Sequence, residues 1–216
     1  MQFVQHSNAY SARLAKDLFE LLTELDLNEV ALLGHSMGSS VIWCYIDLFG
    51  SERLSEIILV DQSPFLTSDS NWTQQQLEDS GAFFTAQQVF DIVAALRSEE
   101  AENVTRQVID EGLTQHATRE MKSGWSNVIC RCPGTLRDSS IQSLAYGLAR
   151  SHPADQPPTL IISGRASVIP WKSQEWIHRQ IRGSQFEVFE EAEGGRHFMF
   201  LENPEKFNRM IMEYLG

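Results

Sequence analysis

The chain has 216 residues, 42% of them hydrophobic, which is enough for one sizeable core in a domain with a subdomain. Its 17 basic and 29 acidic residues give a net charge of −12, which disfavours binding to nucleic acid or to anionic membrane surfaces. No apolar run approaches the roughly 18 residues of a membrane span, and the first residues contain no signal peptide. The three cysteines match neither a disulfide framework nor a zinc site, so we expect reduced thiols in a cytoplasmic protein.

The first quarter of the chain reads as helix, strand, helix, strand. Leucines at helical spacing, with charges between them, predict an amphipathic helix over residues 9–25. The fully apolar run Val30–Leu33 predicts a short buried strand, and residues 37–49 predict a buried helix. The run LSEIILV then predicts a second buried strand.

The character of the sequence changes at Phe65, and no good strand is expected before about Pro157. Residues 85–113 are helical and amphipathic, which predicts a helical insertion. Strand–helix alternation then resumes, with strands expected over 158–164 and 185–191 and helices over 170–181 and 203–216.

Alternating strands and helices predict an α/β fold, a parallel sheet with helices on both faces. Active sites in such sheets lie at the carboxyl ends of the strands. The residues that follow the four predicted strands are therefore the candidates: Ser36, Asp61, the turn at Gly164, and His197.

Ser36 lies in the pattern Gly34-x-Ser36-x-Gly38, between an apolar strand and a helix. This is the nucleophile elbow, in which a strained turn projects the serine hydroxyl into the site. The flanking glycines are expected to let strand and helix approach without Cβ clashes. The N–H of Met37 would lie at a helix N-terminus, where it can stabilise an oxyanion.

A serine needs a general base, and His197 is the natural partner because it follows the last predicted strand. Two glycines before it, Gly194 and Gly195, give its loop freedom to reach the sheet edge. His35 fits worse, because it belongs to the elbow itself and must point away from Ser36.

Four stretches of the sequence stand out: LLGHSMGSS, IILVDQSP, TLIISGRASVIP and GGRHFMFLENPEKF. Together they resemble the α/β-hydrolase superfamily, in particular its esterase, lipase and acyl-hydrolase branch. They occur in that family's order of nucleophile, acid and histidine. The resemblance covers nearly the whole chain. It implies a hydrolase core built from residues 1–64 and 158–216, with 65–157 as the helical cap.

The catalytic acid departs from the usual family pattern. Most members carry an aspartate about three residues after the glycine matching Gly164, where this chain has Ser167. Some members carry the acid on the neighbouring strand instead, and Asp61 stands there. The resemblance therefore implies a Ser36–His197–Asp61 triad, with a turn-capping role for Asp61, or another carboxylate as the acid, as the alternatives.

A second departure lies before the elbow, where the family has further strands and a His-Gly loop. About 55–70 residues of that layout have no counterpart here, so the strand at Val30–Leu33 is expected to form an exposed edge. One of the two oxyanion donors would then be missing. A homodimer that pairs two such edges is the assembly this arrangement favours.

The resemblance implies a serine hydrolase that forms an acyl-enzyme from a small or medium ester, thioester or lactone. It requires no metal and no organic cofactor, and its partner is a small-molecule substrate. Two alternatives remain: a non-catalytic or degenerate protein of the same fold, and a cofactor-independent oxygenase of this superfamily.

Overall fold

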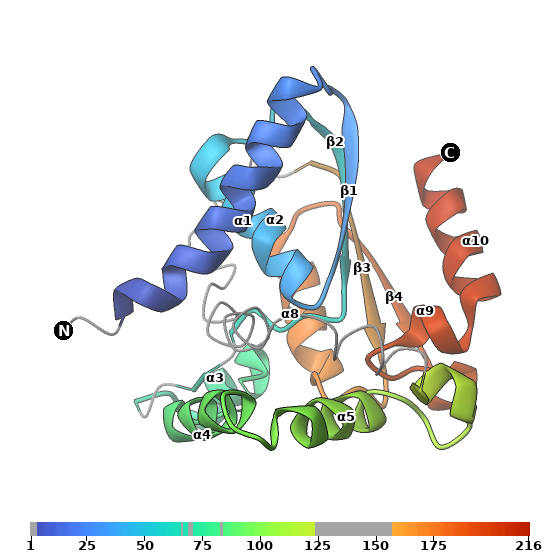
Figure 1. Cartoon of the computed structure of the whole chain (residues 1–216). Helices are drawn as coiled ribbons and strands as arrows, with labels where there is room; N and C mark the ends of the chain where they lie inside the picture. The colour runs from blue at the N-terminus through green and yellow to red at the C-terminus, as the bar shows by residue number, and fades with distance from the viewer. Residues whose placement is uncertain (1–3, 66, 69–70, 83, 124–156) are drawn as a thin grey trace.

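The computed structural model describes residues 4–65, 67–68, 71–82, 84–123 and 157–216. Figure 1 shows a central sheet with helices on both sides and a group of helices at one end. The helices and strands run in the order α1 Val4–Glu24, β1 Val30–His35, α2 Met37–Phe49, β2 Leu54–Val60, α3 Gln74–Ser80, α4 Ala86–Leu96, α5 Ala101–Glu111, β3 Thr159–Gly164, α8 Trp171–Gln180, β4 Gln185–Phe189, α9 Met199–Glu202 and α10 Pro204–Leu215.

The four strands form a parallel sheet in the order β1-β2-β3-β4, which confirms the predicted α/β class. All six residues of β3, Thr159–Gly164, are buried, because β3 has a strand on each side and helices above and below. The three consecutive apolar residues Leu160–Ile162 fit that burial on both faces.

Helices cover both faces of the sheet. On one face, side chains from α2 and α8 pack against the strands in a core that comprises Ile42, Trp43, Ile57, Leu59, Ile161, Ile177 and Ile181. On the other face, α9 and α10 cover a second core made of Ile58, Val60, Leu160, Ile162, Phe189, Met199 and Phe207. The alternation along β2 explains both clusters, since successive side chains point to opposite faces.

Strand β1 lies at one edge of the described sheet, as expected from the sequence. Its side chains alternate in burial, and Leu33 is 46% exposed. Helix α1 covers part of this region by packing on α2, through a cluster that includes Ala15, Leu22, Cys44 and Tyr45. An exposed leucine on an edge strand is an unusual and aggregation-prone feature.

Between β2 and β3 the chain forms α3, α4 and α5, which lie at the end of the sheet where the strands finish (Figure 1). The helical stretch expected over 85–113 is two helices, because the chain turns at Arg97–Glu100. In that turn the Ser98 hydroxyl donates to the Ala95 carbonyl. The remainder of the expected cap, 124–156, lies outside the described residues, so the assignment of 65–157 as a cap stays a prediction.

Candidate active site

Ser36 occupies a strained turn between β1 and α2. Its φ of 52° and ψ of −123° are unusual for a residue that carries a side chain, and such conformations cost about 1–3 kcal/mol. Two hydrogen bonds hold the turn: Ser36 N–H donates to the Val60 carbonyl at 2.8 Å, and Ser39 Oγ donates to the Gly34 carbonyl at 2.7 Å. The surrounding structure thus fixes the strained conformation that an elbow needs.

The two elbow glycines have different reasons to be glycine. A Cβ on Gly34 would lie 2.5 Å from the carbonyl carbon of Gly38, so no side chain fits there. A Cβ on Gly38 would meet no heavy atom of the described residues within 4 Å. The steric expectation therefore holds at Gly34 and is wrong at Gly38. Met37 is the first residue of α2, so its N–H is among those a helix leaves without an intrahelical partner.

Asp61 and His197 are hydrogen-bonded although 136 residues separate them in the chain. The His197 Nδ1 lies 2.7 Å from Asp61 Oδ2. Since an ionised carboxylate can only accept, Nδ1 carries the hydrogen, and a neutral ring in this arrangement has Nε2 free to take a proton. This is the tautomer that a general base for a serine requires.

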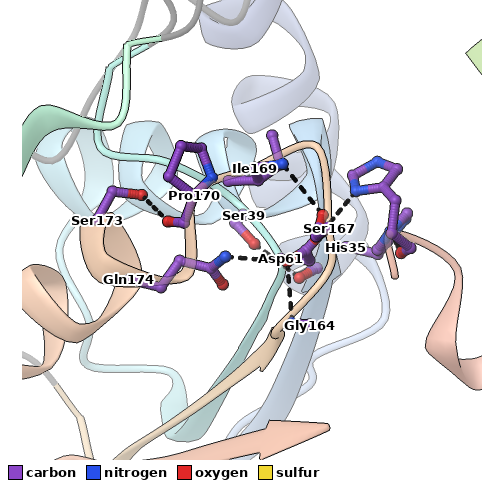
Figure 2. A network of polar contacts seen from close by, with 11 residues as sticks. His35, Ser39, Asp61, Gly164, Ser167, Ile169, Pro170, Ser173 and Gln174 are labelled. Atoms are coloured by element: carbon purple, nitrogen blue, oxygen red, sulfur yellow. Dashed lines mark hydrogen bonds and ion pairs between the residues drawn. The ribbon is translucent and has the colours of Figure 1, made fainter. Parts of the chain in front are cut away.

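The Asp61 carboxylate is fully buried and has three further donors (Figure 2). Its Oδ1 accepts from the Gly164 N–H at 3.3 Å and from Gln174 Nε2 at 2.9 Å, and its Oδ2 accepts from Ser167 Oγ at 2.5 Å. A buried carboxylate is tolerated when it is this fully hydrogen-bonded. The network holds both oxygens in place and leaves Oδ2 aligned with His197.

Ser167 stands where the acid of most family members was expected, and it contacts Asp61 directly. Its hydroxyl also accepts from the Ile169 N–H at 3.1 Å, which orients the hydroxyl hydrogen toward the carboxylate. Gln174 was missed by the sequence reasoning, because a glutamine inside an amphipathic helix carries no distinguishing signal. Its side chain is fully buried in α8 and reaches Asp61 across the end of β3.

The loop that carries His197 is held by the end of α5 and the residues that follow it. The Phe198 N–H donates to the Gly112 carbonyl at 3.2 Å, and Arg196 Nη1 donates to the Glu111 carbonyl at 3.2 Å. The Phe198 ring packs with Ile109 and Leu113 in a small buried cluster. The expected cap thus contacts the histidine loop through backbone and side chains alike.

The predicted site residues lie at one end of the sheet. Because His35 pairs with Val60 in the β1–β2 register, Ser36 and Asp61 are the next residues along two neighbouring strands. Among the described residues, no hydrogen bond joins the Ser36 hydroxyl to His197. Hydrogen bonds between catalytic groups are often long before substrate binds and tighten in the substrate complex.

His35 lies against His197. Its Nε2 is 2.8 Å from the His197 carbonyl oxygen, and the two ring centroids are 4.5 Å apart. The sequence reasoning weighed His35 only as a general base and so missed this contact. Its place directly before Ser36 was the available signal.

Two further features concern metals and membranes. Within the described ranges, no group of three or more His, Cys, Asp or Glu side chains is arranged to hold a metal ion. In the same ranges, no helix combines the length and the apolar character needed to cross a bilayer.

Known proteins resemble this chain over most of its length. The model of the alpha/beta hydrolase family matches residues 6–210. A Synechocystis protein named "Putative non-heme chloroperoxidase" is 27% identical over 218 residues, which cover 93% of this chain and 72% of that protein.

Two solved structures share the fold, each over 93% of this chain. One is an esterase from Exiguobacterium antarcticum, with 25% identity, a TM-score of 0.78 and 71% of that chain covered. The other is a bromoperoxidase from Bacillus anthracis, with 17% identity, a TM-score of 0.82 and 72% of that chain covered. With the family model matched across residues 6–210, the chain belongs to the alpha/beta hydrolase family.

Proposed function

We propose that the chain is a serine hydrolase that cleaves a small or medium ester, thioester or lactone through an acyl-enzyme. Ser36 is the nucleophile, His197 the general base and Asp61 the acid that orients the base. The observation that carries this proposal is the 2.7 Å hydrogen bond between His197 Nδ1 and the buried Asp61 carboxylate, at the strand end next to Ser36.

In the first half of the reaction, Ser36 Oγ attacks the carbonyl carbon of the substrate while His197 Nε2 takes the hydroxyl proton. The charged ring is stabilised by Asp61, which stays ionised. The developing oxyanion accepts from the N–H of Met37 at the start of α2. His197 then returns the proton to the leaving oxygen or sulfur, and the acyl group remains on Ser36.

In the second half, water attacks the acyl carbon and gives a proton to His197 Nε2. Collapse of the intermediate breaks the bond to Ser36 Oγ, and the serine takes its proton back from His197. The acid product leaves and the enzyme returns to its starting state.

The test is labelling with a fluorophosphonate, which phosphonylates activated serines. The adduct should map to Ser36 by mass spectrometry, and Ser36→Ala should abolish both labelling and hydrolysis of p-nitrophenyl esters. Ser68→Ala is the matched control, because Ser68 lies outside the elbow and should leave both unchanged. Absence of a Ser36 adduct in a folded protein would overturn the proposal and favour a non-catalytic role.

A second candidate function follows from the names of two similar proteins, a chloroperoxidase and a bromoperoxidase. Halide oxidation is tested by supplying hydrogen peroxide with bromide or chloride and following halogenation of monochlorodimedone. Halogenation in the absence of ester hydrolysis, with the halogenation lost in Ser36→Ala, would favour this function.

The oxygenase alternative is tested by measuring oxygen consumption. Oxygen consumption that is lost in His197→Gln but kept in Ser36→Ala would favour an oxygenase.

A further inference from the structure

One hydrogen bond joins the elbow strand to the loop of the proposed base. His35 is the last residue of β1 and directly precedes Ser36. Its Nε2 lies 2.8 Å from the carbonyl oxygen of His197, 162 residues further along the chain. The side chain of the residue before the proposed nucleophile is therefore hydrogen-bonded to the main chain of the proposed base.

The protonation state of His35 follows from its surroundings. Burial, and after it the charge of His197, lowers the pKa of His35 from 6.5 to about 3. The ring is therefore neutral near pH 7 and carries a single N–H. Because a carbonyl oxygen can only accept, that hydrogen sits on Nε2. The contact is thus a directional hydrogen bond between neutral groups.

The His35 ring is held in one orientation by aromatic neighbours. The centroid of the His35 ring is 4.9 Å from that of Phe200, with an angle of 76° between the ring planes, and 5.6 Å from that of Phe198. Both phenylalanines follow His197 closely in the chain, Phe198 at the end of the loop and Phe200 in α9. The ring is therefore fixed on the loop side as well as by its own strand, which makes the hydrogen bond well suited to set a distance.

The other contacts of the loop leave this distance undetermined. The Phe198 N–H bonds to Gly112 near the end of α5, and the Gly195 carbonyl accepts from the Ala166 N–H after β3. Neither contact involves β1. The Asp61 carboxylate holds the His197 ring at Nδ1, but it does not hold the main chain of the loop to the elbow.

We propose that His35 is a positioning residue, which sets the distance between Ser36 and His197 by donating Nε2–H to the His197 carbonyl. The inference rests on the proposed function, since it concerns the spacing of the same two groups. Its consequence is kinetic. Because proton transfer is sensitive to displacements of about 1 Å, which can cost roughly 100-fold in rate, loss of this bond should lower kcat and leave KM almost unchanged.

The test compares two substitutions of similar length. Glutamine in His35→Gln can place an amide N–H near the position of Nε2, whereas methionine in His35→Met fills similar space without a donor. We expect His35→Met to lower kcat and the rate of fluorophosphonate labelling by about 10- to 100-fold. His35→Gln should retain both within about threefold. His178→Met is the control. His178 lies in α8, where its Nδ1 is hydrogen-bonded to Ser184 Oγ, and its replacement should leave kcat and the labelling rate unchanged.

Amide hydrogen exchange over residues 195–198 gives a readout that needs no activity. Exchange there should rise in His35→Met and stay at the wild-type rate in His35→Gln. If His35→Met does not fold, His35→Asn replaces it, because its shorter amide cannot reach the carbonyl. If wild-type protein neither labels nor hydrolyses esters, the proposed function fails while the exchange data still decide this inference. Equal exchange and equal kcat in the donor and non-donor variants would overturn it.

Discussion

Replacement of Asp61 by asparagine tests the assignment of the acid with little disturbance of shape. The Gly164 N–H and Gln174 Nε2 both donate to Oδ1, so the amide oxygen of asparagine must take that position. The amide nitrogen then faces Ser167 Oγ and His197 Nδ1. The serine hydroxyl can rotate to accept from it, and His197 can accept only if its hydrogen moves from Nδ1 to Nε2.

The magnitude follows from that change of tautomer. With the hydrogen on Nε2, His197 cannot take the proton of Ser36, and an equivalent substitution in serine proteases lowers kcat about 10⁴-fold. This corresponds to about 5 kcal/mol in the activation free energy. The free energy of unfolding should change by only about 1 kcal/mol, because the two donors to Oδ1 keep their acceptor and the new amide N–H gains acceptors in Ser167 Oγ and His197 Nδ1.

The assay is steady-state hydrolysis of a p-nitrophenyl ester, with urea unfolding measured on the same samples. Glu175→Gln serves as the control, because Glu175 lies in α8 beside the site but pairs with Arg179 at the surface. It should match wild type in both measurements. If Asp61→Asn kept more than about a tenth of wild-type kcat, Asp61 would not be the acid.

Three further predictions rest on particular contacts. Ser167→Ala removes a donor from Asp61 and should lower kcat by about 5- to 30-fold, as measured by ester hydrolysis. Gly34→Ala should lower the free energy of unfolding by more than about 3 kcal/mol or prevent folding. Gly38 lies inside α2, and a Cβ there would have no heavy atom of the described residues within 4 Å, so Gly38→Ala should raise the free energy of unfolding by up to about 1 kcal/mol in urea unfolding. The neutral His35 binds no proton between pH 6.5 and about 3 while the unfolded chain does, so stability falls as the pH drops through that window. Between pH 7 and pH 5 wild type should lose about 2 kcal/mol more than His35→Gln in urea unfolding.

The parallel strands were predictable from the sequence, and so were the strand ends at which the candidate site residues stand, because each rests on a local pattern. The apolar runs at Val30–Leu33 and Leu160–Ile162 indicate two of the parallel strands, and the elbow pattern indicates the turn at Ser36. Asp61 could be found because it ends a strand next to that turn. These features require only the residue and its immediate neighbours.

The partners of the site residues could not be predicted, because they depend on which distant segments meet. Gln174 is one of several polar residues in α8, and only the packing of that helix on β3 brings it to Asp61. The contact of His35 with His197 depends likewise on the path of a loop 162 residues away. At Gly38 the prediction itself was wrong. The motif predicted that a side chain there would clash, and the structure shows no such clash with the described residues.

Ser36 and Asp61 share an unusual backbone conformation at two neighbouring strand ends. Both are residues with side chains at positive φ, 52° and 49°, and both directly follow the paired strand ends His35 and Val60. Each N–H continues the sheet by one hydrogen bond, to Val60 and Ile162 respectively, before the chain turns. The chain therefore leaves two neighbouring strands through two positive-φ residues that lie side by side. Because both turns start from neighbouring strand ends, the loop of His197 has only to reach one point of the sheet edge to approach both residues.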